Sequence, residues 1–195
     1  MNENTSYLLK MSLVSGVLAG LVLGIYQIGP FGNLMWPIFI GLGVTFASGA
    51  ELKKTPNYLC CMICGVIWAL LYLQMDGLLR NAGLNIGVVT GVCTLVITFV
   101  VCAVHMIPLA KTWLNVVPLV FAGLTVTFSQ GGQNLLGVIL GLTCGILVAV
   151  AIEPVTGIFM KKENVEKKER QSVLRRENMK KKTLDFGILY VQTPM

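Results

Sequence analysis

The chain has 195 residues, of which 55% are hydrophobic and only 12% are charged. Too few charged side chains are present to cover a water-soluble globule of this size, which excludes an ordinary soluble enzyme and indicates a membrane protein. The formal net charge of +6 comes from 15 Lys and Arg against 9 Asp and Glu, and ten of these cations lie between Lys161 and Lys182. The basicity therefore belongs to a C-terminal tail, and we expect no nucleic-acid partner.

Apolar stretches that approach the length needed to cross about 30 Å of hydrocarbon occur six times. The expected spans are Met11 to Ile28, Leu34 to Gly49, Tyr58 to Leu78, Ile86 to Ile107, Leu114 to Ser129 and Leu135 to Ile158. Each must be helical where it meets the lipid bilayer, because unpaired backbone groups are not tolerated there. The sequence thus predicts an all-α, polytopic fold, with six transmembrane helices over residues 1–160 and a basic cytoplasmic tail over residues 161–195.

Lys and Arg at the ends of the spans indicate the orientation, because these residues are retained on the cytoplasmic side. With both termini in the cytoplasm, Lys10, Lys53, Lys54, Lys111 and the ten tail cations are inside and Arg80 alone is outside. An odd number of spans would move either Lys10 or the tail across the membrane. Six spans with both termini cytoplasmic is therefore the consistent prediction.

The chain also matches itself, which indicates an internal repeat. At an offset of 82 residues, seven of eleven positions in residues 39–49 are identical to those in residues 121–131, and shorter matches occur at offsets of 80 and 75. A three-span unit is odd, so its second copy must enter the membrane from the opposite side. The prediction is a 3+3 inverted repeat of residues 8–80 and 84–160, an architecture that places solute sites near the pseudo-two-fold axis.

The second and fifth spans are the shortest, and both end in polar and small residues. Together with a mid-span tryptophan, these ends supply the expected pore or substrate residues: Thr45, Phe46, Ser48, Trp68, Thr127, Phe128, Ser129 and Gln130. One interpretation is a pair of half-length helices that meet at a cavity, because irregular backbone is tolerated in a membrane only where it lines one. The alternative is that each segment merely ends a short helix at the interface, and that Trp68 simply packs.

Polar residues also share one face of the fourth span. They are Thr90, Thr94, Thr98, Cys102 and His105, at helical spacings of four, four, four and three. This face is either a hydroxyl-lined path that leads to a gating histidine, or a set of threonines bonded to their own helix beside an interfacial ring. Glu153 is a second ionisable candidate for gating or proton transfer, and a pair with His105 would satisfy both groups.

Other patterns predict packing rather than chemistry. The six cysteines lie inside apolar runs and lack the spacing of a metal site, so we expect neither a metal nor a cofactor. With one histidine and no paired carboxylates, no catalytic residues are assigned and the protein is not expected to be an enzyme. Glycines recur every four residues at Gly16, Gly20 and Gly24 and at Gly137, Gly141 and Gly145, which predicts close helix packing and allows a homo-oligomer.

Three segments resemble a known family. They comprise Trp36, Phe39, Gly41 and Phe46, then Gly65, Val66, Trp68 and Ala69, then Val117, Pro118, Phe121, Gly123, Phe128 and Gly131. This pattern resembles the small bacterial inner-membrane proteins known as domain of unknown function 1097. The resemblance implies a multi-span fold in the bacterial inner membrane and assigns no substrate.

Two functions from different classes follow. The first is a channel or facilitator for a small neutral or weakly polar solute, with an ion held by backbone carbonyls as a variant. The second is a membrane scaffold whose basic cytoplasmic tail binds lipid or a protein partner. Loss of function on deletion of the tail would favour the scaffold, whereas retained solute flux would favour the channel.

Overall fold

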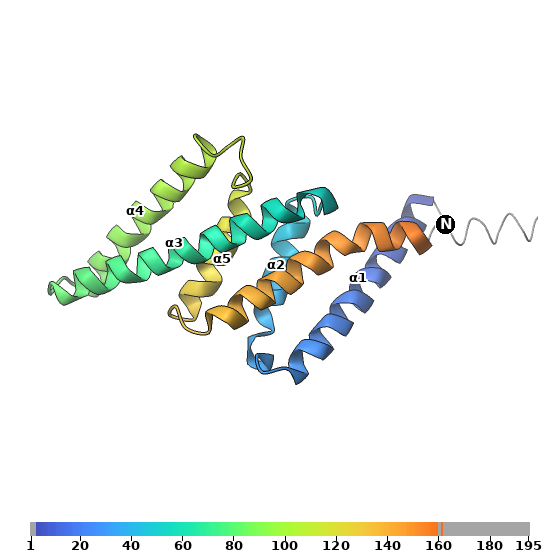
Figure 1. The fold of residues 1–195 in the computed structure, drawn as a ribbon, viewed down its shortest axis with the longest axis horizontal. Helices are drawn as coiled ribbons and strands as arrows, with labels where there is room; N and C mark the ends of the chain where they lie inside the picture. Colours follow the sequence, from blue (N-terminus) through green and yellow to red (C-terminus); the bar gives the residue numbers. More distant parts are fainter. Residues whose placement is uncertain (1–2, 160, 162–195) are drawn as a thin grey trace, which may run out of the picture.

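The computed structural model describes residues 3–159 and 161, and this part of the chain forms helices and no strand (Figure 1). The labelled helices are α1 (Glu3–Ile28), α2 (Trp36–Ala47), α3 (Thr55–Asn81), α4 (Ile86–Met106) and α5 (Val117–Ser129), with 3-10 helices at Gly32–Leu34 and Leu52–Lys54. One more helix, called here the last helix, covers Leu135–Phe159. Apart from Lys161, the predicted basic tail lies outside the described residues.

Four of the helices are long and apolar enough to cross a membrane: α1, α3, α4 and the last helix. The other two, α2 and α5, have 12 and 13 residues. At 1.5 Å per residue they rise about 18–20 Å, whereas the hydrocarbon core is about 30 Å thick. The six expected helices are therefore present, four of them long enough to span the hydrocarbon and two of them shorter.

Proline sets where each short helix begins. Pro37 and Pro118 occupy the first turns of α2 and α5, where the missing N–H removes no helical hydrogen bond. The apolar residues before them, such as Leu114, lie in the preceding connections instead. Counting hydrophobic residues extended the expected spans over these connections.

The same turn ends both short helices. The turn residues are Gly49 and Ala50 after α2, with φ of 96° and 45°, and Gly131 and Gly132 after α5, with φ of 59° and 75°. The N–H of Ala50 donates to the Thr45 carbonyl at 3.0 Å, and that of Gly132 donates to the Thr127 carbonyl at 3.1 Å. This is the Schellman pattern, in which N–H groups of residues with left-handed backbone conformation donate hydrogen bonds to the last carbonyls of a helix.

The short helices lie in the middle of the molecule and are in contact with each other. In Figure 1, α2 runs upward and α5 runs downward, and α3 and the last helix also run in opposite directions. Each short helix crosses a long helix from the other half of the chain: α5 packs on α3, and α2 packs on the last helix.

Glycines make both crossings close. A methyl group on Gly65 of α3 would overlap the Val120 carbonyl oxygen of α5, and one on Gly123 of α5 would overlap the Met62 carbonyl oxygen of α3. In the second crossing, a methyl group on Gly41 would overlap the Leu142 carbonyl oxygen, and one on Gly145 would overlap the Ile38 carbonyl oxygen. Backbones approach to this distance only where side chains are absent on both helices.

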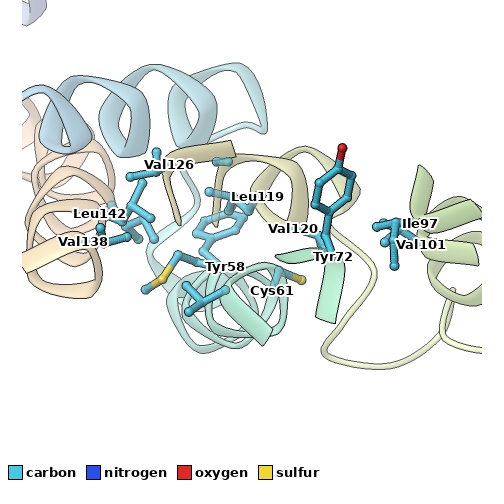
Figure 2. Close-up of a cluster of buried hydrophobic side chains, with 14 of the residues drawn as sticks. Tyr58, Cys61, Tyr72, Ile97, Val101, Leu119, Val120, Val126, Val138 and Leu142 are labelled. Atoms are coloured by element: carbon cyan, nitrogen blue, oxygen red, sulfur yellow. The ribbon is translucent and has the colours of Figure 1, made fainter. Parts of the chain in front are cut away.

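The buried core surrounds these crossings. Figure 2 shows Tyr58, Cys61, Tyr72, Ile97, Val101, Leu119, Val120, Val126, Val138 and Leu142, which come from α3, α4, α5 and the last helix. Helix α1 contributes little to it, because Val14 is its one buried residue among the side chains that the structure describes. The predicted glycine packing is therefore confirmed for the last helix and not for α1, where Gly16, Gly20 and Gly24 meet no described atom within 4 Å.

Candidate functional site

Each of the two short helices buries one threonine. Thr45 of α2 and Thr127 of α5 are both completely buried. Neither hydroxyl oxygen has a hydrogen-bond partner within the described part of the chain. Leaving a buried hydroxyl unpaired costs about 1–3 kcal/mol. Two such groups, 82 residues apart in the sequence, destabilise the core, so packing alone does not explain why both are present.

Neighbouring hydroxyls in these helices find partners in their own backbone. Ser48 donates to the Val44 carbonyl and Ser129 donates to the Val126 carbonyl, each at 2.8 Å. These serines and Gln130 belong to the ends of the two helices, where the Gln130 N–H donates to the Thr127 carbonyl at 3.2 Å. Because the serine hydroxyls are already paired, Thr45 and Thr127 are distinguished as buried side chains without a hydrogen-bond partner in the described structure.

The two phenylalanines that follow the threonines are exposed, whereas the threonines are buried. Phe46 is 41% exposed and Phe128 is 44% exposed. Phe128 packs edge-on against Tyr72 of α3, with ring centroids 4.8 Å apart. The structure therefore separates the phenylalanines from the buried threonines that the sequence grouped with them.

Trp68 and His105 form a second polar cluster, between α3 and the end of α4. The indole N–H of Trp68 lies 3.2 Å from Nε2 of His105, and Nδ1 of His105 lies 2.5 Å from the Leu114 carbonyl oxygen. An indole nitrogen only donates and a carbonyl only accepts, so His105 is neutral and carries its proton on Nδ1. His105 is 1% exposed. His105 thus joins α3, α4 and the segment before α5, and both of its nitrogens are occupied.

Glu153 is not brought to this histidine. The carboxylate lies on an exposed part of the last helix, whereas His105 is buried and bonded to Trp68 and Leu114. The predicted pairing of Glu153 with His105 is therefore wrong. The sequence places both residues near ends of their spans, but it does not show which faces of the two helices meet.

The threonine face of α4 divides into separate environments. Thr94 Oγ1 lies 3.2 Å from the Tyr72 hydroxyl, and either atom can donate. Thr90, Thr94 and Thr98 are exposed at the side of α4, while His105 lies inside. A continuous hydroxyl path from these threonines to the histidine is therefore not formed.

Three polar residues of α3 were absent from the expected set. Tyr58 accepts from the Glu51 N–H at 3.1 Å and secures the turn after α2, and Tyr72 bonds to α4 as described above. Asp76 forms an ion pair with Arg80, and its side chain is only 15% exposed. The spacing of four between Asp76 and Arg80 was a usable signal for a helical ion pair. The tyrosines gave no such signal, since their partners lie on other elements.

The cysteines of α3 serve packing and backbone contacts in this structure. Cys61 Sγ lies 3.4 Å from the Trp113 carbonyl oxygen and accepts from the Val116 N–H at 3.3 Å. Cys64 Sγ lies 3.6 Å from Nε2 of His105. Within the described residues, no three His, Cys, Asp or Glu side chains gather in an arrangement that could hold a metal ion.

Comparison with family models gives a match to the family described as "Protein of unknown function (DUF1097)", over residues 12–157. The chain belongs to this family. The match extends from α1 to the last helix, so it includes both short helices of this DUF1097 protein and both buried threonines. Comparison with curated proteins and with solved structures gives no match.

Proposed function

We propose that this DUF1097 protein is a channel or facilitator for a small neutral or weakly polar solute, which passes between α2 and α5. The observation that carries the proposal is the pair of buried, unpartnered hydroxyls of Thr45 and Thr127. In a state that admits solute, these hydroxyls gain the partners that they lack in the packed state. A neutral solute fits, because no charged residue lies on α2 or α5.

An inverted 3+3 repeat is the architecture that we propose for this pathway. Its support is that equivalent helices of the two halves meet at the two glycine crossings: α3 meets α5, and the last helix meets α2. Gly41 and Gly123 are 82 residues apart, Gly65 and Gly145 are 80 residues apart, and α2 and α5 run in opposite directions (Figure 1). A two-fold rotation that relates the halves would convert the Gly65–Gly123 crossing into the Gly145–Gly41 crossing. Short helices related in this way are typical of transport sites near the membrane midplane.

The proposal includes a bacterial inner-membrane location with both termini in the cytoplasm. The distribution of Lys and Arg supports this orientation, because Lys10, Lys53, Lys54 and Lys111 then share the side of the tail. We expect no enzymatic activity, cofactor or nucleic-acid partner. Homo-oligomerisation stays a prediction, with the open glycine face of α1 as the surface that would permit close approach.

Solute flux into liposomes that contain the purified protein tests this function. The panel comprises glycerol and urea as neutral solutes and sodium chloride as a charged one. We compare the wild type with Thr45→Val, Thr127→Val and the double variant. Valine has the shape of threonine without the hydroxyl, so each change removes hydrogen bonding and leaves packing intact. We expect glycerol or urea flux to fall about fivefold per variant, the equivalent of one hydrogen bond of about 1 kcal/mol.

The matched control is Thr125→Val, on the exposed side of α5. A purely structural role for the buried threonines predicts unchanged flux and slightly higher thermal stability in the valine variants, because an unpaired buried hydroxyl is removed. A fall in flux without loss of stability therefore separates transport from packing. If folded wild-type protein passes none of the three solutes, or if Thr125→Val lowers flux as much as Thr127→Val, the proposed pathway is rejected.

A further inference from the structure

A cavity of about 190 Å³ lies away from the short-helix crossing, between α3, α4 and α5. It is lined by Tyr72, Thr94, Ile97, Thr98, Leu124 and Phe128. Thr94, Thr98 and Phe128 are exposed at its edge, so a ligand can enter without separation of the helices. For comparison, an apolar cavity of about 150 Å³ in another helical protein accommodates benzene. The volume therefore suits a molecule the size of a single ring.

One wall of the cavity is polar. The hydroxyls of Tyr72 and Thr94 are 3.2 Å apart, and Tyr72 is only 5% exposed. Whichever hydroxyl donates in this bond, the other keeps an O–H group to donate elsewhere. The pair is thus held in place, and one of its two hydroxyls keeps an O–H group that a ligand in the cavity can use.

Thr98 adds a third hydroxyl, one helical turn after Thr94 on α4. Thr156 on the last helix uses its hydroxyl to bond the backbone carbonyl four residues before it, as helical serines and threonines commonly do. By contrast, Thr98 has no hydrogen-bond partner among the residues that the structure describes, although it lines the cavity. Its hydroxyl is therefore available to a ligand.

The rest of the lining is apolar and aromatic. Phe128 stands edge-on to Tyr72 with an interplanar angle of 80°, which leaves an aromatic corner beside Ile97 and Leu124. Such corners favour a further ring in an offset or edge contact. No charged residue lines the cavity, so an ionic ligand would lose its hydration without gaining a partner.

We propose that this cavity binds a small neutral ring compound that carries one hydroxyl group, the chemistry of a phenol. The ring occupies the aromatic corner and the hydroxyl bonds to Thr98 and to the Tyr72–Thr94 pair. This site does not depend on the proposed transport function, because it lies between α3, α4 and α5 rather than at the crossing of α2 and α5. Loss of solute flux in Thr45→Val would leave it unaffected, so the two proposals fail separately.

Fluorine NMR on the full-length protein in lipid nanodiscs tests the site, with 4-fluorophenol and 4-fluorotoluene as probes. Empty nanodiscs measure partition into lipid, and the protein-dependent signal gives the dissociation constant. We expect saturable binding of 4-fluorophenol that is at least about fivefold tighter than that of 4-fluorotoluene, which matches one hydrogen bond. Thr98→Val should weaken 4-fluorophenol binding by a similar factor and leave 4-fluorotoluene binding unchanged.

The control is Thr90→Val, because Thr90 lies two turns before Thr98 on the same face of α4 and does not line the cavity. Leu124→Trp fills the cavity and should abolish binding of both probes. If that variant does not fold, Thr98→Phe fills the cavity from the exposed wall. Equal binding of the two probes, or unchanged 4-fluorophenol binding in either filled variant or in Thr98→Val, overturns the proposal.

Discussion

Trp68 and His105 are joined by a hydrogen bond that determines which ring nitrogen of the histidine carries the proton. The indole N–H lies 3.2 Å from Nε2, so this nitrogen accepts and the proton of the ring resides on Nδ1, which faces the Leu114 carbonyl. The bond connects residues 37 positions apart and holds the end of α4 against α3. His105 thus links helices through hydrogen bonds from both ring nitrogens, so neither nitrogen is available for an ion pair.

The first prediction concerns the hydrogen bond between Trp68 and His105. Trp68→Phe keeps an aromatic ring and removes the donor, which leaves buried Nε2 with Cys64 Sγ, at 3.6 Å, as its remaining neighbour. We expect the free energy of unfolding to fall by about 1–2 kcal/mol, the cost of one lost buried hydrogen bond. Denaturant unfolding in mixed detergent micelles, followed by circular dichroism, measures the change.

Trp113→Phe is the control for this variant. Trp113 is 64% exposed, and its ring makes no hydrogen bond in the described structure, so its replacement should change the unfolding free energy by less than about 0.5 kcal/mol. Equal destabilisation in the two variants would mean that loss of the large ring, rather than the bond to His105, explains the effect.

The second prediction concerns the glycines at the helix crossings. Gly65→Ala and Gly123→Ala each place a methyl group against a backbone carbonyl of the facing helix, which cannot move aside as a flexible side chain can. We expect each to cost at least about 2 kcal/mol, in the range for overpacked cores. Gly20→Ala on α1 meets no described atom within 4 Å and should be neutral or slightly stabilising, because alanine favours the helix. Thermal unfolding of all three variants in one detergent provides the comparison.

The third prediction distinguishes the two crossings by coupling. Gly65 and Gly123 belong to the same crossing, so once α3 and α5 are forced apart by one alanine, the second should cost less than it does alone. Gly65 and Gly145 belong to different crossings and meet different backbone atoms, so their effects should add within about 0.5 kcal/mol. A double-mutant cycle on unfolding free energies measures both. Additivity in the first pair would contradict the shared contact.

How much of this fold could be predicted from the sequence depends on the length of each apolar segment. The long helices were located closely, since α4 and the last helix begin at the predicted residues. The short helices were overestimated, because hydropathy does not separate a helix from an apolar connection. Leu34 ends a 3-10 helix and Leu114 lies before α5, although both were counted in spans.

The residues of the candidate site that could be predicted are those in the internal repeat. The match of the chain to itself singled out Thr45 and Thr127, and the structure buries both. It could not reveal that Phe46 and Phe128 face outward, because identity at matching positions does not specify direction. The partners of Tyr72 and His105 depend on which faces of separate helices meet, and no local pattern carries that information.

The last prediction tests orientation across the membrane. Asn81 ends α3 beside Arg80, and Thr112 follows α4 beside Lys111, so the two positions lie at opposite ends of a helix long enough to span. In a chain whose native cysteines are replaced, a cysteine at Asn81 should react with a membrane-impermeant maleimide added to intact spheroplasts. A cysteine at Thr112 should react only after permeabilisation, because Lys111 shares the cytoplasmic side with the N-terminal Lys10. The reverse pattern would place the cation-rich ends outside and reject the proposed orientation, and labelling of both positions in intact cells would show that α4 does not cross.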